Sequence, residues 1–242
     1  GGTRRPGTTV LIEDVAFPLK ELPEATADLQ ELLVTNEYHD ACIYGHALEG
    51  NFHFIISQSF DSPEQVARYE KLMDEVKTLV VDKYDGSLKA EHGTGRNMAP
   101  FVKYEWGERA YGFMKAVKEL FDPKGLLNPG VIFNEDPHCH LKHFKPMPLT
   151  NAHVDKCIEC GFCEVNCLTC GFSLSSRQRI VIQREISRLK KLSDTESSER
   201  LKTLQKQYKY LGNATCAGDG LCSMSCPMGI NVGDLTHDIR QA

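Results

Sequence analysis

Two periods of apolar residues alternate in the first half of the chain. Residues 9–17 are β-branched and apolar up to Pro18, which is typical of a strand, and residues 22–36 place leucines at helical spacing. Two short apolar runs, 40–47 and 52–59, are separated by four residues, as in a β-hairpin. The pattern therefore predicts a strand, a helix and a hairpin in succession.

A helical period returns after the hairpin. Ser62 is expected to cap a long helix that ends near residues 85–86, and a short run at 87–91 predicts a fourth strand. A third helix is predicted at 100–121. The order β-α-β-β-α-β is that of a ferredoxin-like antiparallel sheet with helices packed on it, so residues 1–133 are expected to form an α+β domain.

The second half of the chain has no strand pattern. Residues 134–152 are rich in proline and histidine without periodicity, so we interpret them as a linker. Two charged amphipathic helices are predicted at 178–192 and 196–211, with cysteines clustered at both ends of the pair. Residues 153–242 are therefore expected to form an all-α domain that its cysteines help to hold together.

Composition and charge exclude several classes of protein. The chain has 242 residues, of which 41% are hydrophobic and 25% charged, with a net charge of −5. This composition is globular, and neither half is basic enough for a nucleic-acid-binding protein. With no bilayer-spanning apolar run and no signal peptide, we expect a cytoplasmic location, with peripheral attachment at the inner face of the membrane as a second option. The first residue is not Met, so we expect a piece of something larger.

Cysteine spacing predicts iron–sulfur chemistry. Eight of the ten cysteines lie between residues 157 and 226. In a chain without a signal peptide, tight C-x2-C steps favour metal ligation over disulfides. The run Cys157-x2-Cys160-x2-Cys163-x3-Cys167 has the spacing of a [4Fe–4S] ligand loop, whereas a zinc site needs two C-x2-C knuckles and does not match it.

A second cysteine motif keeps part of the same spacing. Cys216-x5-Cys222-x3-Cys226-Pro227 has Asp219 where the pattern expects a cysteine. Crossed ligation, as in two-cluster ferredoxins, assigns the first cluster to Cys157, Cys160, Cys163 and Cys226, and the second to Cys167, Cys216 and Cys222. Asp219 or Cys170 could supply the fourth ligand of the second cluster; with neither, three thiolates suit a [3Fe–4S] cluster. A single cluster, with the other cysteines buried as small apolar residues, is a further alternative, and Cys42 and Cys139 are expected to be incidental, Cys42 as a packing residue.

Two histidines flank the predicted hairpin turn. If residues 48–51 form the loop, His46 and His53 are directly opposed on one face, with Cβ atoms about 5 Å apart, and can share one divalent ion. Gly50 and Asn51 suit the positive φ angles of such a turn.

Further polar residues follow the predicted fourth strand. Glu91, His92 and Arg96 lie beside two glycines, and a set of two histidines and one carboxylate leaves open positions on a metal for substrate oxygens. Adjacent strand residues face opposite sides, so Glu91 and His92 can share a site only if the strand breaks there. Gly93 makes such a break possible.

Three segments carry a family resemblance. GHALEGNFH (45–53), AEHGTGRNMAP (90–100) and FDPKGLLNPGVIF (121–133) resemble motifs of the C-terminal cap domain of FAD-linked 2-hydroxyacid dehydrogenases of the D-lactate, D-2-hydroxyglutarate and glycolate type. With the cysteine motifs that follow, the chain is similar to the fused form that carries FAD and iron–sulfur domains in one polypeptide. The resemblance covers essentially the whole chain and implies a ferredoxin-like cap domain followed by an all-α helical ferredoxin domain.

The resemblance also implies residue roles. It implies that His46, His53 and Glu91 bind zinc or manganese, and that His92 takes the proton of the substrate hydroxyl while hydride goes to the flavin. It also implies that Arg96 binds a carboxylate of the substrate, with Arg4 or Arg5 as further candidates. Asn128 and Gly130 are implied to lie on the flavin side. No glycine-rich pyrophosphate loop opens a helix after a strand, so FAD is expected on a domain outside this chain.

Two functions from different classes follow. The resemblance implies oxidation of a small D-2-hydroxyacid, D-lactate or similar, to the 2-oxoacid, with electrons passing from FAD through the clusters to an acceptor such as a quinone. The alternative is a non-catalytic iron–sulfur electron-transfer subunit in which the histidines are structural.

Overall fold

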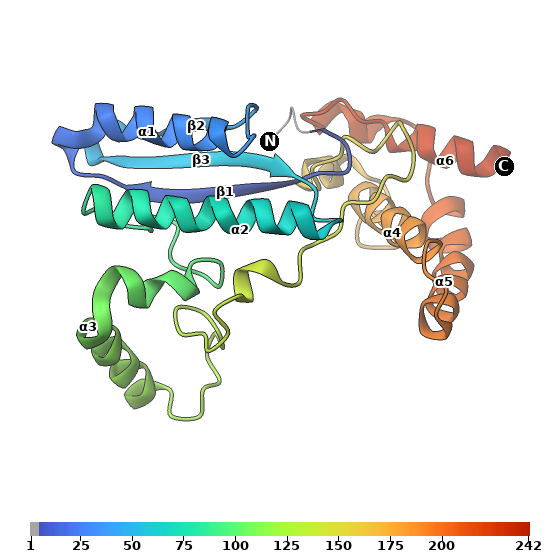
Figure 1. Cartoon of the computed structure of the whole chain (residues 1–242). Helices are drawn as coiled ribbons and strands as arrows, with labels where there is room; N and C mark the ends of the chain where they lie inside the picture. The colour runs from blue at the N-terminus through green and yellow to red at the C-terminus, as the bar shows by residue number, and fades with distance from the viewer. Residues whose placement is uncertain (1–4) are drawn as a thin grey trace. The chain divides into compact units, whose positions relative to one another are not determined.

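The chain contains two compact units. The computed structural model describes residues 5–242, which divide into Val10–Lys145 and Pro146–Ala242, the latter together with residues 5–9. Figure 1 shows the sheet in the first unit and only helices and loops along most of the second. The mixed α/β composition predicted from the hydrophobic pattern is confirmed at this level.

The sheet has three strands, β1 (Thr9–Ala16), β2 (Cys42–His46) and β3 (Asn51–Gln58), with β3 at its centre. Antiparallel pairing joins β2 to β3, and the N–H of Phe17 donates to the carbonyl of Gly50 at 2.8 Å, so that the end of the first strand meets the start of the third. The three strands therefore lie in the order β1-β3-β2.

One face of the sheet is covered by two helices, α1 (Leu22–Thr35) and α2 (Pro63–Lys77), which contact each other. The predicted cap of α2 is present, because the side chain of Ser62 accepts a hydrogen bond from the N–H of Gln65 at 3.4 Å. A π-helical turn, Thr78–Lys83, continues α2 to the predicted end of the helix. The buried core between helices and sheet includes Val15, Leu29, Leu33, Phe54, Ile56, Tyr69, Leu72, Met73 and Val76.

The alternation of side chains along β1 and β3 decides which residues face away from these helices. Val15 and Phe54 belong to the apolar core, so their neighbours Asp14 and His53 lie on the opposite face. Both polar side chains are nevertheless buried, with exposures of 0% and 2%. A polar centre therefore lies on the far face of the sheet.

The predicted fourth strand is wrong. Residues 87–91 contribute only one isolated bridge, between Ser87 and Ala16. The backbone N–H groups of Ala90, Glu91 and His92 instead converge on one oxygen of Asp14, at 2.9, 2.7 and 2.8 Å. Successive N–H groups in a strand point in opposite directions, so three consecutive donors to one oxygen are incompatible with a strand.

The helix predicted at 100–121 is present as α3, Ala99–Phe121, but it is interrupted. Gly107 has φ 72° and ψ 167°, outside the helical region, and divides α3 into two segments. Only the first segment contributes buried residues, and Phe113, Leu120 and Phe121 in the second are exposed. Within the segment predicted as a linker, the ring of Phe144 stacks on Phe60 at 3.8 Å and packs against the core of the first unit.

The second unit confirms the predicted helical pair and adds a third helix. Ser175 and Gln178 form a reciprocal capping box at the start of the first helix, and Asp194 caps the second. The helices are α4 Ser176–Leu189, α5 Thr195–Tyr208 and α6 Val232–Gln241. Across residues 5–242, no helix combines the length and the apolar composition that crossing a bilayer requires.

Two short 3-10 turns, Phe162–Asn166 and Leu221–Ser225, form an internal repeat in the second unit and contact each other. Each follows a glycine with left-handed backbone conformation, Gly161 or Gly220. Each ends at a cysteine with extended backbone conformation, Cys167 or Cys226. The repeat places Cys163 and Cys222 at equivalent buried positions, and by the same offset Cys160 corresponds to Asp219. The degraded cysteine motif thus retains the backbone of the intact one.

Candidate metal centre and cluster-binding loops

Two strands and the loop after residue 90 bring together the predicted histidine and carboxylate ligands. The Nε2 atoms of His46 and His53 lie 3.2 and 2.9 Å from Oε1 of Glu91. Donor atoms at about 2.0–2.2 Å from a tetrahedral zinc lie about 3.3–3.6 Å from one another. One ligand atom from each residue lies within 4.8 Å of the others, so this trio fits a divalent metal ion.

The register of the hairpin differs from the expected one. His53 pairs with Tyr44, and His46 pairs with Asn51, so the histidines are diagonal neighbours on one face instead of directly opposed. The loop begins one residue earlier than predicted, with a 3-10 turn, Ala47–Glu49, that Gly50 closes at φ 68°. The imidazole centroids still lie 5.7 Å apart, because diagonal positions remain within reach of long side chains.

Asp14 is a site residue that the apolar pattern of the first strand concealed. Its Oδ2 accepts the three N–H groups of residues 90–92, and its Oδ1 accepts a hydrogen bond from the side chain of Asn51 at 2.5 Å. Burial alone would raise the pKa of Asp14, but the hydrogen bonds from His92, Asn51, Glu91 and Ala90 outweigh it and lower the pKa. Asp14 is therefore an anion that fixes the backbone on which Glu91 and His92 are carried.

Asp14 also contacts His53, on the Nδ1 side of the imidazole, away from the Nε2 atom that faces Glu91. Its Oδ1 is 3.3 Å from Nδ1 of His53, although the pair is not aligned as a hydrogen bond. The adjacent negative charge favours the proton on Nδ1, which leaves the lone pair of Nε2 for a metal on the Glu91 side. A carboxylate behind a histidine is the usual second partner of a metal ligand, so this contact supports His53 as a ligand.

His92 lies beside the ligand set. Its ring stacks on His53 with centroids 4.4 Å apart and an interplanar angle of 4°, and its Nε2 lies 3.7 Å from Oε1 of Glu91. Asp14, His53 and His92 form a second group of atoms within 4.8 Å. Because both oxygens of Asp14 are already engaged by hydrogen bonds, the trio with Glu91 is the better metal site.

Arg96 lies next to the segment predicted on the flavin side. Its guanidinium donates to the carbonyl of Pro129 at 3.1 Å, and the N–H of Ile132 donates to the carbonyl of Gly95 at 3.2 Å. These contacts bring Arg96 and residues 128–130 together in an exposed part of the first unit. Arg4 lies outside the described residues, and Arg5 is exposed and belongs to the other unit.

The predicted ligands of the first cluster come from both cysteine loops. Cys157 and Cys163 are buried, Cys160 is exposed and Cys226 packs against the same apolar cluster. Burial raises the pKa of Cys157 and of Cys163, partly offset by hydrogen bonds to the sulfurs, so the free thiols are held in their protonated form. A bound cation that replaces these protons would relieve that cost.

The predicted ligands of the second cluster line one small pocket. Cys167, Cys216 and Cys222 are in its wall, together with Asp219. Cys170 is exposed and does not line this pocket. Burial would raise the pKa of Cys167, but hydrogen bonds from Thr169 and backbone N–H groups, with the charge of Arg179, lower it. The pocket therefore joins three thiols to one carboxylate.

The spread of the cysteine sulfurs distinguishes a cluster from a single ion. Four thiolates at 2.3 Å from a zinc ion lie about 3.8 Å from one another. Among the residues that the structure describes, the groups of three ligand atoms within 4.8 Å contain no cysteine. The loops thus fit a larger inorganic group held at its corners better than one metal ion.

The two remaining cysteines lie apart from these loops. Cys42 is exposed at the start of β2, so the prediction that it is a packing residue is wrong. The Cys139 thiol donates to the carbonyl of Arg96 at 3.3 Å.

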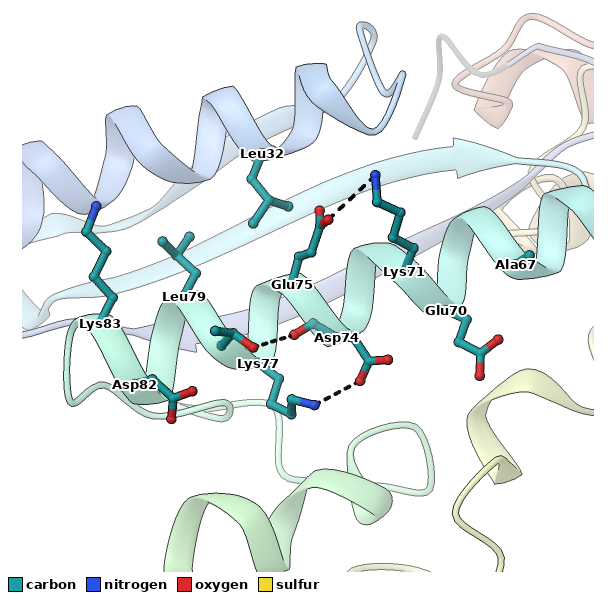
Figure 2. A pocket seen from close by; sticks show the side chains of 11 residues that line it. Leu32, Ala67, Glu70, Lys71, Asp74, Glu75, Lys77, Leu79, Asp82 and Lys83 are labelled. Atoms are coloured by element: carbon teal, nitrogen blue, oxygen red, sulfur yellow. Dashed lines mark hydrogen bonds and ion pairs between the residues drawn. The ribbon is translucent and has the colours of Figure 1, made fainter.

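A hollow beside α2 contains none of these residues. Figure 2 shows its charged side chains, with Lys71 paired to Glu75 and Lys77 paired to Asp74. Exposed pairs one helical turn apart are common on solvated helix faces, so the hollow offers no chemistry of its own.

Comparisons with known proteins agree with this arrangement. Residues 2–132 match the family described as FAD linked oxidases, C-terminal domain, and residues 153–230 match the 4Fe-4S dicluster domain. The relatives include the glycolate oxidase subunit GlcD of Bacillus subtilis, 27% identical over 53% of this chain and 27% of that protein. A probable mitochondrial D-lactate dehydrogenase of Danio rerio is 30% identical over 53% of this chain and 25% of that protein.

A third relative is the D-2-hydroxyglutarate dehydrogenase of Stutzerimonas stutzeri, 33% identical over 50% of this chain and 26% of that protein. The chain thus spans about a quarter of the length of the curated relatives it matches. These matches confirm the resemblance drawn from the motifs. The match to the FAD linked oxidases, C-terminal domain, covers more than half of the chain. The chain therefore belongs to the FAD-linked oxidase C-terminal domain family, and this domain is followed by a 4Fe–4S dicluster domain.

Proposed function

We propose that this chain supplies the substrate-side metal site and the iron–sulfur clusters of a flavin-dependent oxidoreductase that oxidises a D-2-hydroxyacid to the 2-oxoacid. The observation that carries the proposal is the convergence of His46, His53 and Glu91, with Asp14 behind His53. The names of the relatives, which act on glycolate, D-lactate and D-2-hydroxyglutarate, support the substrate class.

The ligand set divides its tasks between rigid and exposed groups. His53 is buried and held by the sheet, whereas His46 and Glu91 have side chains that are 61% and 48% exposed. A zinc or manganese ion bound there would act as a Lewis acid on the hydroxyl and carboxylate oxygens of the substrate. The exposed side of the trio leaves room for those oxygens.

His92 is the base in this proposal. Its Nε2, on the side of Glu91, takes the proton of the substrate hydroxyl. Its backbone is anchored to Asp14, and its ring is held against His53, so the base keeps a fixed position beside the metal ligands. Arg96 provides a guanidinium for the substrate carboxylate, and Asn128 and Gly130 beside it face the flavin. FAD, bound outside this chain, supplies the hydride acceptor.

The second unit carries the electrons onward in this proposal. Cys157, Cys160, Cys163 and Cys226 hold a [4Fe–4S] cluster, and Cys167, Cys216 and Cys222 hold a second cluster, of the [4Fe–4S] or [3Fe–4S] type. Asp219 is the better fourth ligand, since it lines the pocket of the other three whereas Cys170 is exposed. The acceptor is a quinone or another small oxidant.

Metal titration tests the proposed site. The metal-stripped chain, titrated with zinc and with manganese by calorimetry, is expected to bind one divalent ion outside the cysteine loops. His46→Ala should weaken that binding more than tenfold, while His39→Ala, which removes an exposed histidine elsewhere in the first unit, should leave it unchanged. Unchanged affinity in the His46→Ala variant would contradict the substrate site and favour a non-catalytic electron-transfer subunit.

A further inference from the structure

The pocket of the second cluster contains a buried cation. Arg179 is 1% exposed, and its Nη1 lies 3.7 Å from Sγ of Cys167. Its other hydrogen bonds go to neutral acceptors, namely the carbonyl of Gly212 at 2.6 Å and the hydroxyls of Thr169 and Thr215 at 3.0 and 3.1 Å. Within residues 5–242, no carboxylate forms an ion pair with Arg179. A buried charge without a counter-ion is costly, so its position beside a thiolate ligand requires an anionic partner there.

The loop of the first cluster contains a buried arginine of a different kind. Arg184 is 4% exposed, but its Nη1 lies 2.5 Å from Oε1 of Glu159, which neutralises its charge. Its Nη2 donates to backbone carbonyls, at 2.9 Å to Cys157 and 3.3 Å to Asp155, and the sulfur that its Nη1 contacts, at 3.9 Å, belongs to Met147 and not to a cysteine. The internal repeat is therefore electrostatically unequal, with a compensated arginine at the first loop and an uncompensated one at the second.

This inequality has a consequence for electron transfer. Reduction adds a negative charge to a cluster, and the net charge nearby and the hydrogen bonds to the cluster sulfurs set its potential. We propose that Arg179 is a positioning residue that raises the reduction potential of the second cluster above that of the first. This inference rests on the cluster ligands of the proposed function. One electron would then pass from the first cluster, which is oxidised, to the second cluster, which is reduced. Reduced flavin is the electron donor, and the quinone-type molecule is the final acceptor.

The test is an anaerobic redox titration of the cluster-loaded full chain, followed by electron paramagnetic resonance. Asp219→Cys changes only the second site and so identifies its signal. In the unmodified chain, the second cluster is expected to have the higher potential. Arg179→Gln should lower the ratio of reduced to oxidised second cluster at least tenfold at a given potential, which is about 59 mV for one electron, and leave the first cluster unchanged. Arg179→Lys, which keeps the charge, should retain most of the unmodified value.

A reciprocal variant supplies the control at the other loop. Glu159→Gln removes the counter-ion of Arg184 and should raise the potential of the first cluster while leaving the second unchanged. Two results would overturn the inference and leave the ligand assignment standing. The first is an intact second cluster whose reduction potential is unchanged in Arg179→Gln. The second is a potential of the second cluster below that of the first in the unmodified chain. Iron and sulfide for one cluster only would overturn the ligand assignment, and the inference with it. If Arg179→Gln lost its second cluster, the potentials in Arg179→Lys and Glu159→Gln would test the inference instead. A second cluster of much lower potential in Arg179→Lys, or a first cluster of unchanged potential in Glu159→Gln, would contradict it.

Discussion

Replacing Asp14 with asparagine removes the charge that holds the loop of Glu91 and His92 against the sheet. The carboxylate accepts three backbone N–H groups from residues 90–92 and one from the side chain of Asn51. Asparagine has nearly the same shape, so the change isolates the charge and one acceptor oxygen from packing. Asp14→Asn therefore perturbs the backbone of the proposed metal site with little change in packing.

The expected size of the effect follows from these four hydrogen bonds. Bonds to a charged acceptor contribute about 1.5–3 kcal/mol each, against about 0.5–1.5 kcal/mol for neutral pairs. Asparagine keeps one oxygen for the three N–H groups, a loss of about 1 kcal/mol per bond, and its new NH2 group opposes that of Asn51. We expect the free energy of unfolding to fall by about 3–4 kcal/mol. Zinc affinity should fall 10–100-fold, on the order found when a carboxylate behind a metal ligand is removed.

The pH dependence gives this prediction a second signature. Burial alone would raise the pKa of Asp14, but its hydrogen bonds lower it below the ordinary value of 3.8. A carboxyl with a lowered folded-state pKa stabilises the fold above its unfolded pKa, and that stability is lost as the pH falls through the folded value. The difference between unmodified chain and variant should be full at pH 7 and shrink below about pH 4.

Urea unfolding followed by circular dichroism, in the presence of a chelator, measures the stability difference, and calorimetry measures zinc affinity. Glu31→Gln, which removes an exposed carboxylate from α1, is the control and should change stability by less than about 0.5 kcal/mol. A change below about 1 kcal/mol for Asp14→Asn, with unaltered zinc affinity, would refute the role assigned to Asp14.

Three further predictions concern the ligands, the hairpin and the cysteines. Glu91→Gln should weaken zinc binding more than tenfold in calorimetry with little loss of stability, because the side chain is half exposed, and unchanged affinity would exclude Glu91 as a ligand. Gly50→Ala should destabilise the chain by more than about 1 kcal/mol in urea unfolding, because its Cβ would lie 2.2 Å from the carbonyl oxygen of Phe17 at φ 68°; Gly112→Ala, with open space around it, should not. Cys222→Ser should lose the iron and sulfide of one cluster, whereas Cys170→Ser should retain both, and the reverse result would exchange their roles.

Local signals predicted every α-helix except α6, and the hairpin that carries two of the candidate ligands. Ser62 caps α2 as predicted, and the structure shows that Ser175 caps α4 through the same kind of short-range hydrogen bond. The spacing of His46 and His53 implied a hairpin, whereas Glu91 was expected at the end of a strand and entered the predicted ligand set through the family resemblance. The structure brings the three side chains together. The cysteine offsets anticipated the repeat of the two 3-10 turns for the same reason.

Long-range electrostatics were not predictable in this way. Asp14 stands within an apolar strand, and its N–H partners lie 76 to 78 residues further along the chain, so no local period connects them. That contact also explains why the predicted fourth strand does not form. The hairpin register shifted because Gly50, and not Asn51, takes the left-handed conformation beside Phe17. Arg179 and Arg184 are equally invisible, since both look like ordinary polar positions of an amphipathic helix.

Metal and sulfide analysis of the anaerobically purified chain tests the central claim most directly. The proposed function predicts about seven or eight irons with matching acid-labile sulfide, as expected for two clusters. It also predicts one zinc or manganese ion per chain that is lost in His53→Ala without loss of iron. Zinc bound by the cysteines with no sulfide, or a divalent ion that stays bound when His53 is replaced, would contradict it.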